Sequence, residues 1–396
     1  MLAERIKTFM PSSILDTEVK ARELRARGFD VISFGAGIPD FDTPEHIKNA
    51  ASRAIAQGRT KLTDASGIPE LRAAVCTKLK RDNDLDYEPG DIIICSGAKQ
   101  ALFNIMMVLI NPGDEVIIPS PFWVSYPEQV RLLGGVPVGV ETEEAKGFDL
   151  DVERVRAAVT ARTRAVIVNS PNNPTGAVFS RDVLSALSEL AVERDLWIIS
   201  DETYEGLSFD GRPPSIASFG PEIKARTLVV NSCSKSYAMT GWRIGYAAGP
   251  RSVVQAIAAV QGQVTVCPSS MGQWAAVEAL SGPQDETRRM KEALERRRRI
   301  LTDKLNTLPG ISCKMPQGTF YAFANISGLC GRRTPEGHSL DGSVDVANFF
   351  LAHAHVAVVP GLDFGSDRHV RMSFGIGEEL IREGVDRMGA AISRLS

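Results

Sequence analysis

The sequence predicts an α/β protein in which a large domain holds a mostly parallel central sheet and a smaller domain is α+β. Its 396 residues exceed what a single hydrophobic core usually accommodates. Apolar runs of strand length alternate with amphipathic stretches of helix length. The strand-like runs are continuously apolar, which indicates a parallel sheet buried on both faces by helices. After about residue 275 this alternation stops, which favours a second domain.

The elements follow in chain order. Strands of the large domain are expected at 92–95, 115–118, 136–140, 165–168, 196–199, 227–230 and 264–267, with helices at 99–109 and 181–193. The second region predicts a long polar helix at 283–306, strands at 320–323, 356–359 and 370–374, and a closing helix at 378–394. The first forty-odd residues are expected to pack on this region. We therefore place the large domain at 45–278 and form the small domain from 1–44 together with 279–396.

Composition excludes several classes of protein. The net charge is −3, and no basic block resembles a nucleic-acid footprint. Charged residues interrupt the N-terminal stretch where a signal peptide needs its apolar segment, and the apolar run 101–110 is too short to cross a bilayer. Six scattered cysteines without a C-x-x-C pair suggest free thiols, and the five histidines have no metal-ligand spacing. We expect a cytoplasmic protein without a metal, a nucleic-acid partner or a membrane partner.

Polar residues gather where four predicted strands end. They are Ser96–Ala98, Asn169–Gly176, Asp201–Tyr204 and Ser232–Lys235. In an open parallel sheet, ligands bind at the carboxyl ends of the strands. The four segments together predict a ligand site at that edge of the sheet.

The residue types at this edge suggest carbonyl chemistry. Lys235 stands in "SCSKS" directly after an apolar strand, where desolvation lowers the pKa of a lysine and makes it a nucleophile. Asp201 ends a buried strand and needs a cationic partner, such as a pyridinium nitrogen. The helix beginning near Ser96–Ala98, with Ser232 and Arg243, would suit a phosphate. The alternatives are a lysine that only packs its stem and an aspartate that only caps a turn.

Several long motifs occur in order, among them "SKSYAMTGWRIGY", "SPNNPTGAVFS", "SDETYEGLSFDG", "SGAKQALFN" and "PSPFWVSYPE". Together they resemble the class I/II pyridoxal-phosphate (PLP) aminotransferases of fold type I, and most of all the bacterial aspartate/prephenate aminotransferase branch. The resemblance extends from "GAGIPDFDTPEHI" to "HVRMSFG". It implies a homodimer with shared active sites, PLP as cofactor, and amino acids and 2-oxo acids as substrates.

The resemblance also implies roles for individual residues. Lys235 would form a Schiff base with the cofactor and move the substrate proton, with Asp201 at the pyridine nitrogen and Tyr204 at the phenolic oxygen as the other catalytic residues. The implied cofactor-binding residues are Gly97, Ala98, Lys99, Trp123, Asn173, Asp201, Tyr204, Ser232, Lys235 and Arg243. The implied substrate-binding residues are Gly37, Lys99, Trp123, Asn173 and Arg371.

Lys99 stands where the aspartate branch has a lysine near the distal carboxylate of the substrate, which favours aspartate or glutamate; alternatively it is only a surface residue at a helix start. Leu62 replaces a tyrosine that in relatives reaches the cofactor phosphate of the neighbouring subunit, and Cys233 precedes the reactive lysine by two positions. These departures leave alternatives open: a PLP-dependent lyase, decarboxylase or cyclase, or an aminotransferase for another amino acid. The effector domain of a transcription regulator is disfavoured by the acidic charge and the early start of the motifs.

Overall fold

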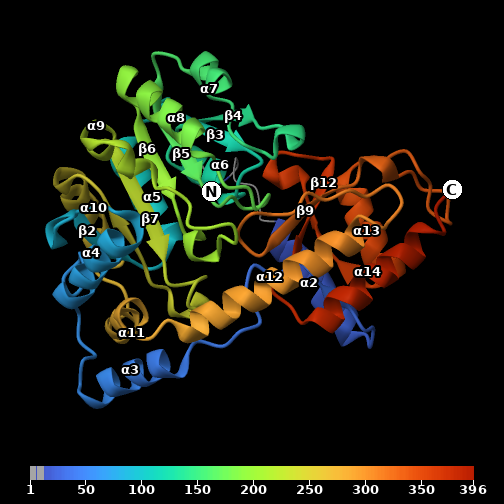
Figure 1. Cartoon of the computed structure of the whole chain (residues 1–396), viewed down its shortest axis with the longest axis horizontal. Coiled ribbons are helices and arrows are strands. Elements are labelled where there is room, and N and C mark those ends of the chain that lie inside the picture. The colour runs from blue at the N-terminus through green and yellow to red at the C-terminus, as the bar shows by residue number, and fades with distance from the viewer. Residues whose placement is uncertain (1–5, 7–12) are drawn as a thin grey trace.

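A sheet of seven strands forms the centre of the larger part of the molecule (Figure 1). The computed structural model describes residue 6 and residues 13–396. The strands lie in the order β2-β8-β7-β6-β5-β3-β4. Their bounds are β2 Ile92–Cys95, β3 Glu115–Ser120, β4 Val136–Glu141, β5 Thr163–Asn169, β6 Trp197–Asp201, β7 Thr227–Ser232 and β8 Gly245–Ala248. Strands β3 to β7 are parallel, and β8 runs antiparallel to both β2 and β7.

Alternating side chains of each central strand enter cores on opposite faces of this sheet. In β2, Ile92 and Ile94 pack on one side, while Ile93 and Cys95 pack on the other. The helices of this part of the molecule are α3 Glu45–Ala56, α4 Pro69–Asn83, α5 Ala98–Leu109, α6 Ser125–Leu132, α7 Val152–Ala158, α8 Arg181–Glu193, α9 Pro221–Lys224, α10 Arg251–Val264 and α11 Ser270–Ser281, of which α3 packs on α11. Burial on both faces explains why the strands read as continuous apolar runs.

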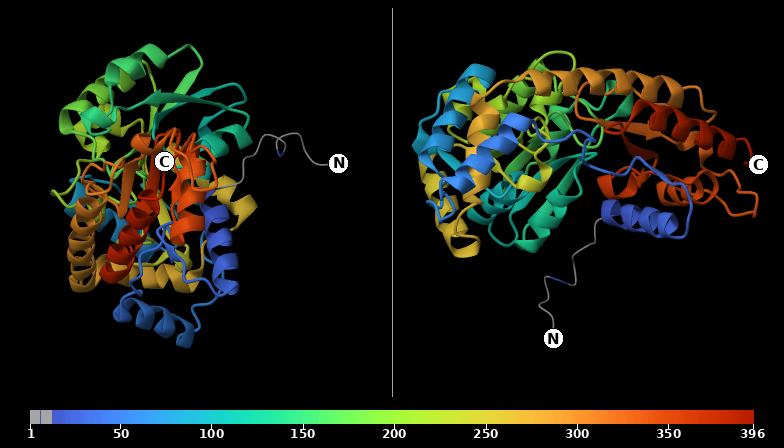
Figure 2. Two further views of the ribbon diagram at one scale, coloured as in Figure 1. Left: turned by 90° about the vertical axis from the view of Figure 1, so that its right-hand side faces the viewer. Right: turned by 90° about the horizontal axis from the view of Figure 1, so that it is seen from below.

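A second, smaller set of strands lies on the other side of the molecule (Figure 2). The antiparallel sheet β11-β12-β9 consists of Val359–Pro360, His369–Ser373 and Tyr321–Asn325, and β1 Ile32–Ser33 pairs in parallel with β10 Val356–Ala357. The helices here are α2 Ser13–Ala26, α12 Asp285–Leu305, α13 Ser343–Ala354 and α14 Glu378–Ile392. Helix α12 extends from the larger part of the molecule to this one (Figure 1).

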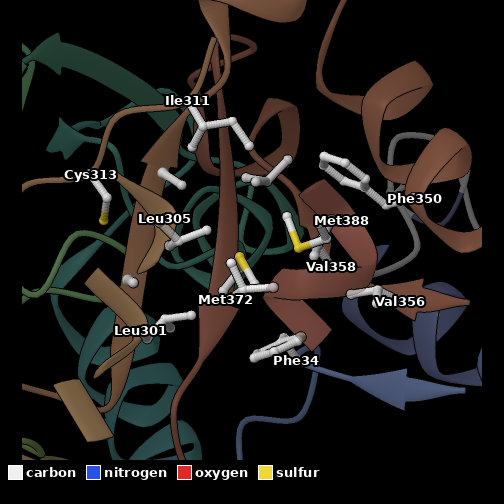
Figure 3. Packing of buried hydrophobic residues seen from close by; sticks show 14 of the residues in the cluster. Phe34, Leu301, Leu305, Ile311, Cys313, Phe350, Val356, Val358, Met372 and Met388 are labelled. Carbon is white, nitrogen blue, oxygen red and sulfur yellow. The ribbon is translucent and has the colours of Figure 1, made fainter. Parts of the chain in front are cut away.

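The core of the smaller part joins segments from both ends of the chain (Figure 3). Phe34 from the N-terminal segment lies with Met372 of β12, Met388 of α14 and Leu301 of α12. The side chain of Phe34 is fully buried. Phe34 therefore joins the described N-terminal segment to the core of the smaller part.

Most predicted elements are present within a few residues of their expected bounds. The expected strand at 356–359 is divided into β10 and β11, which belong to different sheets. Other features differ as well. The expected strand at 264–267 is wrong. Val264 is the last residue of α10, and Val266 has a positive φ of 63°, which lies outside the β region. Strand β4 is an edge strand and not doubly buried, so Val136 is 45% exposed. Strand β8 was not predicted.

The division into domains at 45–278 and at 1–44 with 279–396 stays a prediction. Residues 1–5 and 7–12 of that division lie outside the described residues. Within the described part of the chain, no helix has both the length and the hydrophobicity required to span a membrane.

Candidate active site

A cavity of about 570 Å³ opens at the carboxyl ends of strands β5, β6 and β7. It is lined by every predicted site residue except Gly97: Gly37, Ala98, Lys99, Trp123, Asn173, Asp201, Tyr204, Ser232, Lys235, Arg243 and Arg371. The register explains the convergence, because Asn169 at the end of β5 pairs with Asp201 at the end of β6. A separate hollow of about 670 Å³, lined in part by residues 177–181 and 314–317, contains none of the predicted site residues.

Lys235 reaches into this cavity from the turn that follows β7. Its Nζ donates to the carbonyl of Gly37 at 2.6 Å and lies 5.4 Å from the ring centre of Phe320. Burial lowers the pKa of Lys235, and the nearby cations Arg371 and Arg243 lower it further, against the opposing effects of Tyr321 and Asp201. A lysine whose neutral form is favoured in this way is suited to act as a nucleophile and a base.

Asp201 is buried at the floor of the cavity, with 5% of its surface exposed. The hydroxyl of Tyr126 donates to its Oδ2 at 2.7 Å, and the amide of Thr203 donates to its Oδ1 at 3.1 Å. Burial raises the pKa of Asp201, although these hydrogen bonds and Lys235 oppose that effect. A cationic ligand atom beside the carboxylate would favour its ionised form.

The N-terminus of α5 forms one end of the cavity. Its first amides have no acceptor within their own helix, so they are available to an anion. Gly97 has φ +85°, and a Cβ at this position would collide with the guanidinium of Arg243. Arg243 donates from Nη1 to the carbonyl of Thr240 at 2.9 Å, and Ser232 lies at the end of the neighbouring strand β7. Together these groups form a compact site for a phosphate-like anion.

Lys99 and Trp123 lie beside this anion site. The Nζ of Lys99 is 4.9 Å from the centre of the Trp123 ring, and the Trp123 ring meets Tyr126 edge-on at 5.3 Å. Burial lowers the pKa of Lys99, and Arg243 and Lys235 lower it further. Several basic side chains would therefore stabilise an anion bound in this cavity.

Arg371 forms the opposite end of the cavity and comes from β12 of the smaller sheet. It is 1% exposed. Its Nη1 donates to Oδ1 of Asn173 at 3.2 Å, and its Nη2 donates to the carbonyl of Gly35 at 2.9 Å. Its guanidinium lies 4.3 Å from the centre of the Tyr321 ring. These contacts hold the planar group in one orientation, which is the arrangement that carboxylate recognition requires.

Some residues at the site were not predicted from the sequence. Tyr126 bonds Asp201, and the hydroxyl of Tyr321 lies 3.2 Å from that of Tyr204. The signal for Tyr126 was present, since it lies one helical turn after Trp123 within a quoted motif. No comparable signal marks Tyr321, whose position depends on the pairing of β9 with β12.

Two departures from the resembled family lie outside the cavity lining. Leu62 is 78% exposed on the surface of the chain. Cys233 is buried in the core beneath β2, β7 and β8, and burial raises the pKa of its thiol to about 12. The thiol is therefore a packing group in this fold.

The residues present fit PLP. A buried carboxylate with a raised pKa suits a pyridinium nitrogen, and a desolvated lysine suits an aldehyde. The glycine at position 97, the start of α5, Ser232 and Arg243 suit a phosphate. Asn173 and Tyr204 supply polar groups between these positions.

Comparisons with known proteins agree with this fit. A family model described as aminotransferase class I and II matches residues 30–388. An aspartate aminotransferase of Geobacillus stearothermophilus is 45% identical over 391 residues, which cover 98% of each chain. An aspartate/prephenate aminotransferase of Thermus thermophilus is 46% identical over 397 residues, which cover 99% of each chain.

Solved structures give the same result. The aspartate aminotransferase of Rhizobium meliloti matches with a TM-score of 0.97 and 45% identity over 100% of both chains. The aspartate aminotransferase of Thermus thermophilus, solved with maleate, matches with a TM-score of 0.92 and 45% identity over 99% of both chains. Both neighbours therefore share the whole fold and not a part of it.

Proposed function

The chain belongs to the class I and II aminotransferases. From this premise we propose that the protein transfers the amino group of aspartate or glutamate to a 2-oxo acid in this cavity. The enzyme is a PLP-dependent aminotransferase that acts on an amino acid and a 2-oxo acid. The choice of a dicarboxylic substrate and the roles of individual residues are the proposal.

This proposal rests on the charged side chains that line the cavity. Among the described lining residues, Lys99, Arg243 and Arg371 are basic side chains in addition to the reactive Lys235, whereas Asp201 is the one carboxylate. A cavity with this surplus of positive charge favours ligands with several anionic groups. The phosphate of PLP and the two carboxylates of a dicarboxylic amino acid would supply them. The aspartate aminotransferase of Thermus thermophilus was solved with maleate, a dicarboxylate, which supports the same choice.

In the proposed arrangement, each end of the cavity holds a different anion. The α5 N-terminus with Ser232 and Arg243 holds the phosphate, and the Arg371 guanidinium holds the α-carboxylate of the substrate as a fork. Lys99 lies beside the α5 end, where it would bind the distal carboxylate. Trp123 would lie against the cofactor ring, and Gly37 would border the substrate.

Bound PLP supplies an aldehyde that links to a lysine and a ring that accepts electrons from the substrate. Asp201 would keep the pyridine nitrogen protonated, since its carboxylate gains a cationic partner there. Asn173 and Tyr204 would hydrogen-bond the phenolic oxygen. Lys235 would remove the proton from the substrate α-carbon, because burial favours its neutral, basic form.

The role of Lys99 is tested by comparing substrates. In the variant Lys99→Met we expect kcat/KM for aspartate to fall about 10- to 100-fold, the value of one charge-assisted hydrogen bond. The kcat/KM for alanine, which lacks a distal carboxylate, should change less than about threefold. Steady-state kinetics with both amino acids measures the ratio. An equal loss for the two substrates would contradict the role of Lys99 in recognising the distal carboxylate.

We extend the proposal to a homodimer. Leu62, Val264 and Val266 are large apolar side chains that the single chain leaves exposed. They lie on adjoining segments, because the amide of Thr63 bonds the Cys267 sulfur at 3.4 Å. A second copy of the chain would cover such a patch.

We also propose a cytoplasmic location. All six cysteines fall within the described residues, and each is a free thiol. Free thiols are typical of reducing compartments.

A further inference from the structure

A cluster of buried polar side chains lies outside the cavity lining, beneath the ends of β6 and β7. We call it the acid cluster and define it as Lys78, Asn83, Glu202, Glu205 and Asn231. All five are buried. Lys78 and Asn83 come from α4, whereas the other three come from the two segments that carry Asp201 and Lys235.

Glu205 is the centre of the acid cluster. Lys78 forms an ion pair with its Oε1. Asn83 Nδ2 donates to its Oε2 at 2.6 Å, and Asn231 Nδ2 donates to its Oε1 at 2.8 Å. The Nζ of Lys78 also donates to Oδ1 of Asn83 at 2.7 Å. The three partners fix Glu205 from two directions, one along α4 and one along β7.

Glu202 forms the second half of the acid cluster. Its Oε1 accepts from the hydroxyls of Ser200 at 2.9 Å and Ser215 at 2.6 Å. Its Oε2 accepts from Asn83 Nδ2 at 3.4 Å, so Asn83 links the two carboxylates. Burial and the neighbouring Glu205 raise the pKa of Glu202 to about 7.

Two of the three backbone segments that carry the acid cluster, 201–205 and 231–235, also carry the site, whereas α4 does not. Asp201, Thr203 and Tyr204 line the cavity, while Glu202 and Glu205 between and after them do not. In the same way Ser232 and Lys235 line the cavity, while Asn231 does not. The amide of Ser232 is itself bonded to Oδ1 of Asn231 at 2.7 Å. The cavity and the acid cluster therefore occupy opposite sides of the same two segments.

Stability alone does not account for such a cluster. Burying charged groups is costly, and replacing a buried ion pair by apolar residues is often neutral or stabilising. A network whose members are bonded from several directions instead fixes one geometry. Here the fixed geometry is that of the segments that present Asp201, Tyr204 and Lys235.

We propose that Lys78, Glu202 and Glu205 are positioning residues, which hold segments 201–205 and 231–235 so that Asp201, Tyr204 and Lys235 face the cofactor together. The inference rests on the proposed roles of those three residues. The charges of the acid cluster also act on these three residues from the side opposite the cavity. The ionisable groups that interact with Glu202 are Lys78 on α4, Glu205 on its own segment, and Tyr87 before β2. Asp82 on α4 lies 4.0 Å from the Nζ of Lys78.

Two variants change the charge of the acid cluster in opposite directions. Lys78→Met leaves Glu205 without its cation, and the added negative charge should stabilise the protonated form of the cofactor-linked lysine. Glu202→Gln removes the negative charge that Glu202 carries above a pH of about 7 and should destabilise that form there. In the PLP-loaded enzyme we expect the pH midpoint of the cofactor absorbance change to rise in Lys78→Met and to fall in Glu202→Gln, each by roughly half a unit.

Kinetics supplies the second readout. Displacing the reacting groups should lower kcat about tenfold in Lys78→Met. The KM for aspartate should change less than about twofold, because Arg371 stands on a different sheet. The matched control is Lys80→Met, two residues along α4, where the lysine is exposed. This control should match the wild type in both the midpoint and kcat.

The outcomes separate the positioning role from the proposed function. If the wild type binds PLP and transaminates while Lys78→Met and Glu202→Gln match Lys80→Met in midpoint and kcat, the positioning role is overturned and the function stands. A loss of thermal stability without a midpoint shift also overturns it. If Lys78→Met does not fold, the direction of the midpoint shift in Glu202→Gln decides. A wild type that does not bind PLP overturns both.

Discussion

At the scale of single residues, burial shifts the pKa values of a basic and an acidic side chain in the cavity in opposite directions. It lowers the pKa of Lys235 and raises the pKa of Asp201, although each shift is opposed by contacts with neighbours. The lowered pKa of Lys235 favours its neutral, nucleophilic form. The raised pKa makes ionisation of the carboxyl more costly, and a cationic neighbour such as a pyridinium nitrogen would favour its ionised form. The same environment therefore prepares both groups for PLP.

Arg371 provides a prediction at this scale. Its guanidinium bonds Asn173 and Gly35 and lies over Tyr321, so its orientation is fixed from three sides. In Arg371→Lys we expect kcat/KM for aspartate to fall about 100-fold, mostly through KM, because an ammonium group cannot bind a carboxylate as a fork. Affinity for PLP, measured by fluorescence titration, should be unchanged. The exposed Arg368→Lys serves as the control. A normal KM in Arg371→Lys would remove the guanidinium from substrate binding.

At the scale of elements, the sequence predicted the strands whose burial is symmetric and the polar residues that follow them. Strands β5, β6 and β7 are continuous apolar runs, and Asn169, Asp201 and Ser232 end them as expected. Strand β8 was not predicted, because Gly245–Ala248 consists mostly of small residues and so lacks the apolar run that marks the other strands. Its place depends on antiparallel pairing with β2 and β7, which are distant in sequence.

Contacts between segments that are distant in sequence also explain why two site residues, Tyr126 and Tyr321, were not predicted. Tyr126 comes from α6, which packs against β3 and β4, and it reaches Asp201 at the end of the distant strand β6. Tyr321 reaches Tyr204 only because the smaller sheet lies against the larger part of the molecule. Local sequence specifies a helix or a strand but not which distant side chain it meets. The acid cluster belongs to this class as well, since Lys78 and Glu205 are 127 residues apart.

At the scale of the whole molecule, the cavity exists because two sheets meet. The seven-stranded sheet supplies Asp201 and the segment with Lys235, and the three-stranded sheet supplies Arg371. A second contact joins the same two parts: Glu144 accepts from Asn325 Nδ2 at 2.5 Å and lies 3.1 Å from His369 Nε2. Burial lowers the pKa of His369, which favours its neutral form.

The proposed dimer gives a prediction at this scale. By sedimentation equilibrium the wild type should show twice the 42.9 kDa mass of one chain. In Val264→Glu a charge would be buried at the interface, so the dimer should weaken by about tenfold or more in Kd. The control is Val136→Glu, which changes an equally apolar side chain that is exposed on the edge strand β4. A monomeric wild type would contradict the dimer.

The most direct test of the central claim is the absorbance spectrum of the PLP-loaded enzyme before and after addition of L-aspartate or L-glutamate. We predict that the visible band of the lysine-linked cofactor disappears with either amino acid and returns when a 2-oxo acid is added. In Lys235→Ala this exchange should not turn over. A bound cofactor whose spectrum ignores both amino acids would contradict a dicarboxylate aminotransferase at this cavity.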